Sequence, residues 1–127
     1  MKLNKIDYNK LNARQKENYN FHKIASALAE YGYDCMRLNN DWEGADFIAV
    51  KDDEMLKVQL KGRFTILHKY KGKDIYIAYA ENGECKMFYH DDAYKYAGYD
   101  ESNKAWKEMG QHYPKTPKKY EPIITVL

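Results

Sequence analysis

The sequence predicts an α/β protein in which helices pack on a mixed β-sheet, with the element order α-β-β-β-β-β-α. Apolar residues at helical spacing near the N-terminus indicate a helix, and short runs rich in β-branched and aromatic residues indicate strands. A length of 127 residues suits one domain with a single hydrophobic core. We therefore expect one domain over residues 1–127, with a core at about 12–100 and an extended tail at about 110–127.

The first expected element is a helix at about residues 12–31. Ile24 and Leu28 lie one turn apart in its apolar stripe, and Gly32 provides a stop signal. Glu17 falls within the same stripe, where a carboxylate is unfavourable unless it reaches solvent or a cation. Glu17 is therefore a candidate functional residue.

Strands and short helices account for the rest of the chain. Strands are expected at 33–38, 46–50, 55–62, 74–80 and 85–90, joined by turns at 39–44, 51–54 and 81–84. A short helix is expected to start after His90, with Asp91 or Asp92 as its cap, and another near 102–109. The proline-containing tail from His112 is expected to be extended.

Composition excludes several classes of protein. Charged residues make up 31% of the chain, and no apolar run approaches the roughly 18 residues that a membrane span needs. No apolar region follows the basic start, so we expect no secretory signal, a cytoplasmic location and no membrane partner. Cys35 and Cys85 lie far apart without ligand spacing, so we expect reduced thiols and neither zinc nor a disulfide.

Charge is distributed unevenly, although the net charge of +2 implies no partner. Acidic residues dominate positions 41–54, and basic residues dominate positions 57–73. A metal-dependent phosphodiester site needs both, because carboxylates hold a cation and lysines hold phosphates. Two solvated loops are the alternative explanation. Asp41 and Glu43 could supplement a metal site, although acids in turns are usually only solvated.

Side chains alternate along the expected strand at 55–62, so Gln59 and Lys61 share one face. If this strand pairs with the one before it, Asp46 lies within reach of both residues. An amphipathic strand with a solvated face would explain Gln59 and Lys61 without any function. The presence of Glu17, a second acid directed at the same region, favours a metal site.

These residues resemble the PD-(D/E)xK nuclease superfamily over about residues 14–90. The resemblance rests on Glu17 in the first helix, "GADF" with Asp46, and "VQLK" with Gln59 and Lys61, giving the pattern D-x12-Q-x-K. A residue other than proline precedes the aspartate, and glutamine replaces the usual acid of the last motif. The resemblance implies a restriction-endonuclease-like core and hydrolysis of DNA that leaves a 5′-phosphate and a 3′-hydroxyl.

Roles for these residues follow from the chemistry of phosphodiester hydrolysis. Mg²⁺ prefers hard oxygen ligands, so the Asp46 carboxylate, the Gln59 side-chain oxygen and the Leu60 carbonyl could hold one ion, with Mn²⁺ as a substitute. Lys61 would orient the attacking water and stabilise charge in the transition state. Glu17 would hold a metal-bound water or a second, weaker ion. We expect no organic cofactor.

DNA is the expected partner, and Arg63, Lys69, Lys71 and Lys73 are expected to contact its phosphates. Tyr70, which lies among these lysines, could also contact DNA. A homodimer is expected if the protein cuts both strands. Two alternatives compete with an endonuclease: a non-catalytic DNA-binding or assembly module on the same fold, and an unrelated α/β protein in which the proposed site residues never meet.

Overall fold

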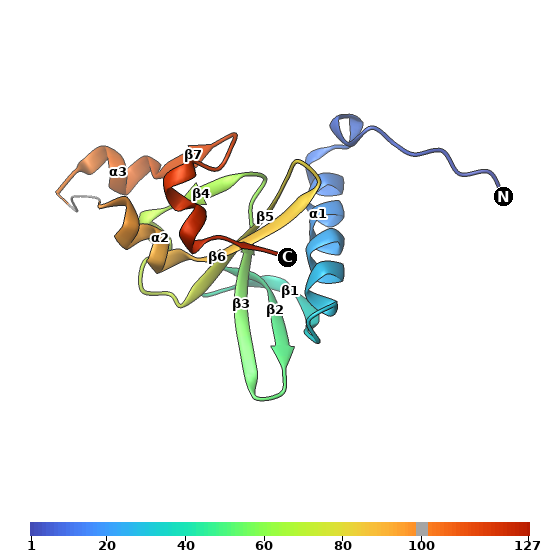
Figure 1. Cartoon of the computed structure of the whole chain (residues 1–127), viewed down its shortest axis with the longest axis horizontal. Coiled ribbons are helices and arrows are strands. Elements are labelled where there is room, and N and C mark those ends of the chain that lie inside the picture. The colour runs from blue at the N-terminus through green and yellow to red at the C-terminus, as the bar shows by residue number, and fades with distance from the viewer. Residues whose placement is uncertain (99–101) are drawn as a thin grey trace.

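A computed structural model describes residues 1–98 and 102–127. Within these residues the chain forms a mixed six-stranded sheet in the order β1-β2-β3-β5-β6-β8 (Figure 1). The strands are β1 (Asp34–Trp42), β2 (Ala45–Lys51), β3 (Glu54–Leu60), β5 (Ile75–Glu81), β6 (Glu84–Tyr89) and β8 (Thr125–Val126). The predicted fold class, helices packed on a mixed sheet, is confirmed at this level.

The pairing of β3 with β5 is parallel, whereas the other neighbouring strands of this sheet are antiparallel. Antiparallel neighbours can be joined by a tight turn, but a parallel pair needs a longer crossover. Residues 61–74 form this crossover. It contains β4 (Phe64–Ile66), which pairs with β7 (Gln111–Tyr113), and the 3-10 helix η2 (His68–Tyr70). The crossover also carries most of the basic segment of the sequence.

Helix α1 (Ala13–Ala29) confirms the predicted N-terminal helix. Asn12 and Gln15 form a reciprocal capping box, which satisfies backbone N–H groups at the start of the helix. Its apolar stripe packs on one face of the sheet, where the rings of Phe21 and Phe47 meet edge to face at 5.1 Å between centroids. Burial of this stripe fixes the helix against β2 and β3.

The other face of the sheet packs against C-terminal elements, which are α2 (His90–Ala97), α3 (Lys104–Met109) and the 3-10 helix η3 (Lys118–Ile123). A further 3-10 helix, η1 (Tyr8–Lys10), precedes α1. The expectation of an extended tail is wrong for Lys118–Ile123, because these residues form the 3-10 helix η3. Tyr120 is fully buried there, with its ring centroid 4.7 Å from that of Phe64. Among the described residues, no helix has the length and apolar character needed to cross a membrane.

The start of α2 also differs from the prediction. The helix begins at His90 itself, with Tyr89 at the N-cap position. Asp91 and Asp92 therefore lie in the first turn, and neither is the cap residue. His90 is completely buried in this first turn, where its Nε2 accepts a hydrogen bond from the Leu67 amide of the crossover.

The expected turn at 39–44 is wrong in extent. Strand β1 continues to Trp42, and the turn is formed by Glu43 and Gly44, whose φ angles are 51° and 89°. The register between β1 and β2 shifts between Arg37 and Trp42, at a β-bulge or another irregularity of the pairing. This irregularity lets a polar segment, which resembles a loop in the sequence, continue the strand. Asp41 consequently lies on a strand beside the candidate site.

Candidate active site

The hairpin of β2 and β3 forms the framework of the candidate site. Its register pairs Phe47 with Val58, so Asp46 and Gln59 occupy the next positions along the two strands. Val58 and Leu60 belong to the core under α1, and Gln59 between them faces the opposite side of the sheet. The predicted pairing of these strands and the predicted alternation of faces are confirmed.

Asp46 is a partly buried carboxylate at the start of β2. Its Oδ2 accepts a hydrogen bond of 2.9 Å from the Leu60 amide. Burial, together with the nearby carboxylates of Asp41 and Glu17, raises the pKa of Asp46 to about 6, although the hydrogen bond from Leu60 opposes this shift. Negative charges are therefore concentrated here, and a bound cation would stabilise the ionised form of Asp46.

Lys61 lies directly after β3, where its backbone amide donates a 2.9 Å hydrogen bond to the Ala78 carbonyl. Burial lowers the pKa of Lys61, and the nearby carboxylates of Asp46 and Asp41 oppose this effect. Its Nζ lies 5.2 Å from the centroid of the Tyr70 ring. Lys61 follows Leu60, whose amide binds Asp46, so Lys61 and Asp46 lie at the same end of the hairpin.

Gln59 is the most unusual polar residue of the hairpin, because it is 9% exposed. Its Nε2 donates a long hydrogen bond of 3.4 Å to the Leu60 carbonyl. Within the described part of the chain, its Oε1 is buried and has no hydrogen-bond partner. A buried acceptor without a partner is costly, so it marks either strain or a place for a ligand.

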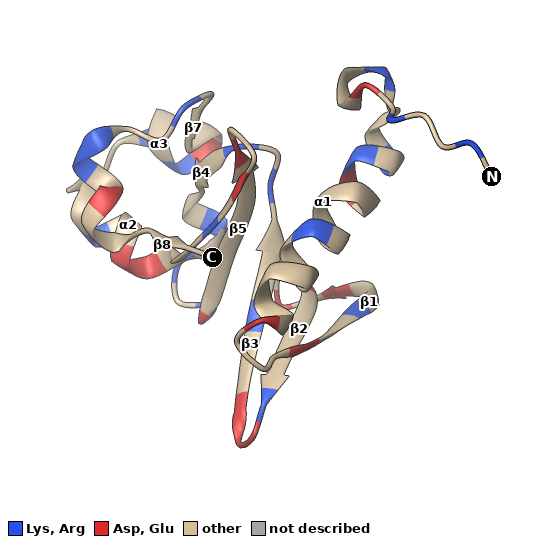
Figure 2. Ribbon diagram, turned by 45° about the vertical axis from the view of Figure 1, so that its right-hand side comes forward, with Lys and Arg blue, Asp and Glu red and all other residues tan. Residues whose placement is uncertain are grey.

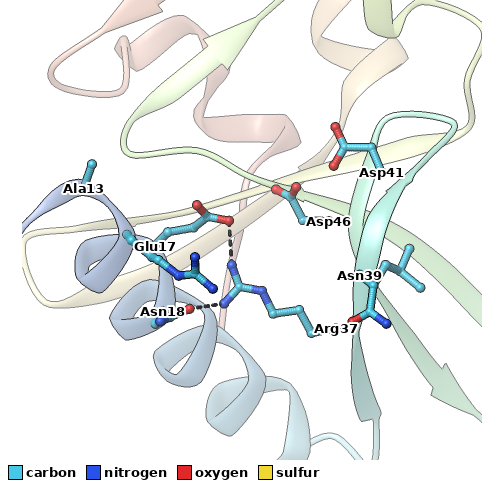
Figure 3. A pocket seen from close by; sticks show the side chains of 9 residues that line it. Ala13, Glu17, Asn18, Arg37, Asn39, Asp41 and Asp46 are labelled. Carbon is cyan, nitrogen blue, oxygen red and sulfur yellow. Dashed lines mark hydrogen bonds and ion pairs between the residues drawn. The ribbon is translucent and has the colours of Figure 1, made fainter.

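Glu17 projects from α1 toward the same end of the sheet (Figure 3). Its Oε1 forms an ion pair of 2.5 Å with Nη2 of Arg37 on β1, and Nη1 of the same arginine donates to Asn18 Oδ1, also at 2.5 Å. The Glu17 side chain remains half exposed. Arg37 was not predicted as part of the site, since no spacing rule connects a strand residue with a helix residue so far from it in the sequence.

A cavity of about 640 Å³ opens between α1 and the β1–β2 hairpin. It is lined by Ala13, Arg14, Glu17, Asn18, Arg37, Leu38, Asn39, Asp41 and Asp46. Figure 3 shows Glu17, Asp41 and Asp46 around this space, with their carboxylates coming from three different elements. Asp41, which the sequence indicated as a minor candidate, therefore belongs with the predicted acids.

Over residues 1–98 and 102–127, no group of three or more His, Cys, Asp or Glu side chains is arranged to hold a metal ion. A cation at Asp46 would therefore need other oxygen ligands. The Gln59 Oε1, which lacks a hydrogen-bond partner in the described part of the chain, and the Leu60 carbonyl are oxygens of the hard type that Mg²⁺ prefers. The residues present thus fit a magnesium ion, provided that these two oxygens take part.

The predicted DNA-contacting residues are distributed along the crossover. Lys69 Nζ lies 5.2 Å from the centroid of the Tyr70 ring. Lys71 and Lys73 line a separate cavity of about 330 Å³, and Arg63 comes just before β4. Figure 2 shows basic residues just beyond the end of β3 and acidic residues at the β2–β3 turn. The structure therefore distributes these basic residues along the crossover and does not group them in one compact patch.

Comparison with known proteins identifies no relative. No protein-family model matches the chain. No curated protein and no solved structure matches it either. A functional interpretation therefore depends on the residues of the candidate site themselves.

Proposed function

We propose that this chain is a metal-dependent DNA endonuclease of the PD-(D/E)xK type with a restriction-endonuclease-like core. The supporting observation is the convergence of Asp46, Gln59 and Lys61 at one end of the β2–β3 hairpin. These residues contribute a carboxylate, a buried amide oxygen that has no hydrogen-bond partner within residues 1–98 and 102–127, and an ammonium group. Phosphodiester hydrolysis uses such a set, because a cation must be held and developing negative charge must be offset.

Mg²⁺ is the cofactor that suits these ligands, and Mn²⁺ can replace it. The Asp46 carboxylate, the Gln59 Oε1 and the Leu60 carbonyl would hold the ion. When bound, a divalent ion supplies positive charge beside the phosphate and makes a neighbouring water more acidic. Because Gln59 is neutral, this set carries less charge than one with an acid at that position, and ion affinity should be correspondingly modest.

Lys61 would be the protein side chain that assists the attack of water on the phosphate. Its ammonium can donate a hydrogen bond to the attacking water and to a phosphoryl oxygen, which orients the water and offsets charge. Asp46 would stay ionised once a cation is present. Glu17, on the rim of the same cavity, would hold a water or a second, weaker ion when it is not paired with Arg37.

DNA is the proposed substrate, and the basic crossover supports this choice. Arg63, Lys69, Lys71 and Lys73 would contact phosphates, which gives affinity without sequence information. Hydrolysis of the PD-(D/E)xK type would leave a 5′-phosphate and a 3′-hydroxyl. A homodimer would present one such site to each strand of a duplex.

A second candidate function is a non-catalytic DNA-binding or assembly module on the same fold. One observation favours it: among the described residues, no three acidic, histidine or cysteine side chains are grouped to hold a metal ion. The neutral Gln59 in place of an acid is consistent with this function. Such a protein would bind DNA with the same salt dependence but would leave it intact.

Incubation with supercoiled plasmid distinguishes these two functions. Wild type should convert plasmid to nicked or linear forms with Mg²⁺ or Mn²⁺ and leave it unchanged in EDTA. Asp46→Asn should lack this activity, whereas Asp53→Asn, at the far hairpin turn, should retain it. DNA binding without cleavage under all metal conditions would favour the non-catalytic module.

A further inference from the structure

Tyr70 forms a buried aromatic wall beside the candidate site. The residue is 4% exposed, and the ammonium groups of Lys61 and Lys69 each lie 5.2 Å from the centroid of its ring. The face of an aromatic ring carries partial negative charge and attracts cations. The ring therefore attracts two lysines, one from the end of β3 and one from the crossover.

Helix α2 supports this ring from behind. His90 is completely buried, and its ring meets that of Tyr70 edge to face at 5.6 Å between centroids. His90 Nε2 accepts a 3.2 Å hydrogen bond from the Leu67 amide, and Asp91 Oδ2 accepts one of 3.1 Å from the Gly72 amide. The first turn of α2 thus anchors the crossover on both sides of Tyr70 and limits movement of its ring.

The turn before Asp46 packs against the Tyr70 ring through Gly44. A Cβ atom on Gly44 would lie 3.3 Å from both Cδ1 and Cε1 of Tyr70 and 3.1 Å from Cδ1 of Ile75. These distances are tight, and the φ angle of 89° at Gly44 also disfavours other residues. The glycine therefore lets the Tyr70 ring lie against the turn that carries Asp46.

We propose that Tyr70 is a positioning residue that holds the Lys61 ammonium beside Asp46; this inference rests on the proposed nuclease function. A lysine side chain has many rotamers, and its ammonium contributes to a reaction only when it is held near the reacting atoms. An aromatic ring fixes the ammonium while leaving its charge and its N–H donors available.

Cleavage kinetics test this role with variants of graded effect. Tyr70→Phe keeps the ring and should retain kcat within about twofold, whereas Tyr70→Leu removes it and should lower kcat about tenfold with KM unchanged. Pentafluorophenylalanine at position 70 keeps the volume of the ring but reverses the partial charge of its face. It should therefore lower kcat as Tyr70→Leu does, and it serves as the test if Tyr70→Leu folds poorly. Wild-type kcat in both the leucine and the pentafluoro variants would overturn the proposal.

A spectroscopic measurement tests the positioning without any cleavage. Protons above an aromatic ring resonate upfield, so the Lys61 Cε protons should be shifted upfield in wild type and Tyr70→Phe and should return to the ordinary lysine position in Tyr70→Leu. Tyr33→Leu is the matched control, since it removes a ring 5.5 Å from Lys51 Nζ. It should leave cleavage and the Lys61 resonances unchanged.

The two measurements separate failure of this inference from failure of the proposed function. If wild type does not cleave DNA in any metal, the nuclease proposal fails, and the Lys61 resonances alone then decide whether Tyr70 holds the ammonium. If wild type cleaves DNA but the Lys61 resonances are the same with and without the ring, Tyr70 is a structural residue and the inference is overturned.

Discussion

At the scale of single residues, the hairpin combines groups that would be unfavourable in an ordinary core. Asp46 is a partly buried carboxylate close to two other acids, and Gln59 is a buried amide whose Oε1 lacks a partner among the described residues. Both features cost stability in the metal-free chain. Residues of this kind are typical of functional sites, which often lower the stability of the fold that carries them.

Asp46→Asn should stabilise the metal-free protein at neutral pH. The pKa of Asp46 is about 6 in the folded chain and 3.8 for the free side chain, so the folded state holds more protons between these values. The free energy of unfolding should therefore fall as the pH rises from about 4 to 6 and stay lower above that range. The variant cannot ionise, yet its Oδ1 can still accept from the Leu60 amide.

Thermal and urea unfolding in EDTA at pH 4 and pH 7.5 measure this effect. At pH 7.5 the variant should be more stable than wild type by on the order of 1–2 kcal/mol, and the difference should shrink at pH 4. Asp34→Asn, on the edge strand β1, serves as the control and should change little. If the free energy of unfolding has the same pH dependence in wild type and in Asp46→Asn, the pKa of Asp46 is not raised in the folded chain.

Gln59→Glu should tighten Mg²⁺ binding and destabilise the metal-free chain. Glutamate has nearly the same shape as glutamine but adds a negative charge beside Asp46. The added charge strengthens the attraction for a cation, and without a cation the two carboxylates repel each other. Isothermal titration with Mg²⁺ should show a lower Kd, and unfolding in EDTA a lower midpoint. Gln111→Glu on β7 is the control. An unchanged Kd would show that Gln59 does not contact the ion.

At the scale of elements, sequence patterns predicted α1 and the β2–β3 hairpin because each is defined by local periodicity. The alternation in β3 correctly placed Gln59 away from the α1 core, and pairing of the strands brought Asp46 to it. The extent of β1 was missed, since the irregular pairing of β1 with β2 allows polar residues to continue the strand. The ion pair of Arg37 with Glu17 depends on how α1 packs on the sheet, which no local pattern encodes.

The crossover of residues 61–74 belongs to this scale, and its lysines should control DNA affinity. Changing Lys69, Lys71 and Lys73 together to alanine should weaken binding to every DNA sequence alike. The slope of log K against log salt should become shallower by about one unit for each of these lysines that binds a phosphate in the wild type. The matched control is the triple alanine variant of Lys115, Lys118 and Lys119, in the C-terminal segment.

Fluorescence titrations at several salt concentrations provide the measurement. The control should change affinity slightly through net charge while keeping the wild-type slope. Parallel lines for wild type and the crossover variant would remove this segment from the DNA surface. Lys69 also lies over the Tyr70 ring. The single variant Lys69→Ala therefore shows how much of the loss of DNA affinity in the triple variant comes from this lysine.

At the scale of the whole molecule, the sheet separates a core under α1 from a second core formed with the C-terminal elements (Figure 1). The sequence predicted one domain of mixed α/β class but assigned the chain beyond about residue 110 to an extended tail. Tyr120, which is buried in the second core, could not be recognised as a core residue because short helices give weak periodicity. The restriction-endonuclease-like character of the fold remains our proposal.

Tyr120→Ala should therefore destabilise the whole domain, not just its C-terminus. The side chain is fully buried against Phe64, and removal of a large aromatic residue from a core costs about 3–5 kcal/mol. Urea unfolding should show one transition with a lower midpoint. Tyr31→Ala, on an exposed side chain, is the control. A wild-type midpoint for Tyr120→Ala would show that the C-terminal segment is dispensable to the fold.

The central claim is that Lys61 acts in metal-dependent cleavage of DNA. The most direct measurement is the rate of plasmid cleavage in Mg²⁺ by Lys61→Ala, compared with wild type and with Lys51→Ala, a strand lysine outside the site. Lys61→Ala should bind DNA and unfold like wild type but cleave at least about 10²-fold more slowly, while Lys51→Ala cleaves normally. Equal cleavage by Lys61→Ala and wild type would contradict the proposed mechanism.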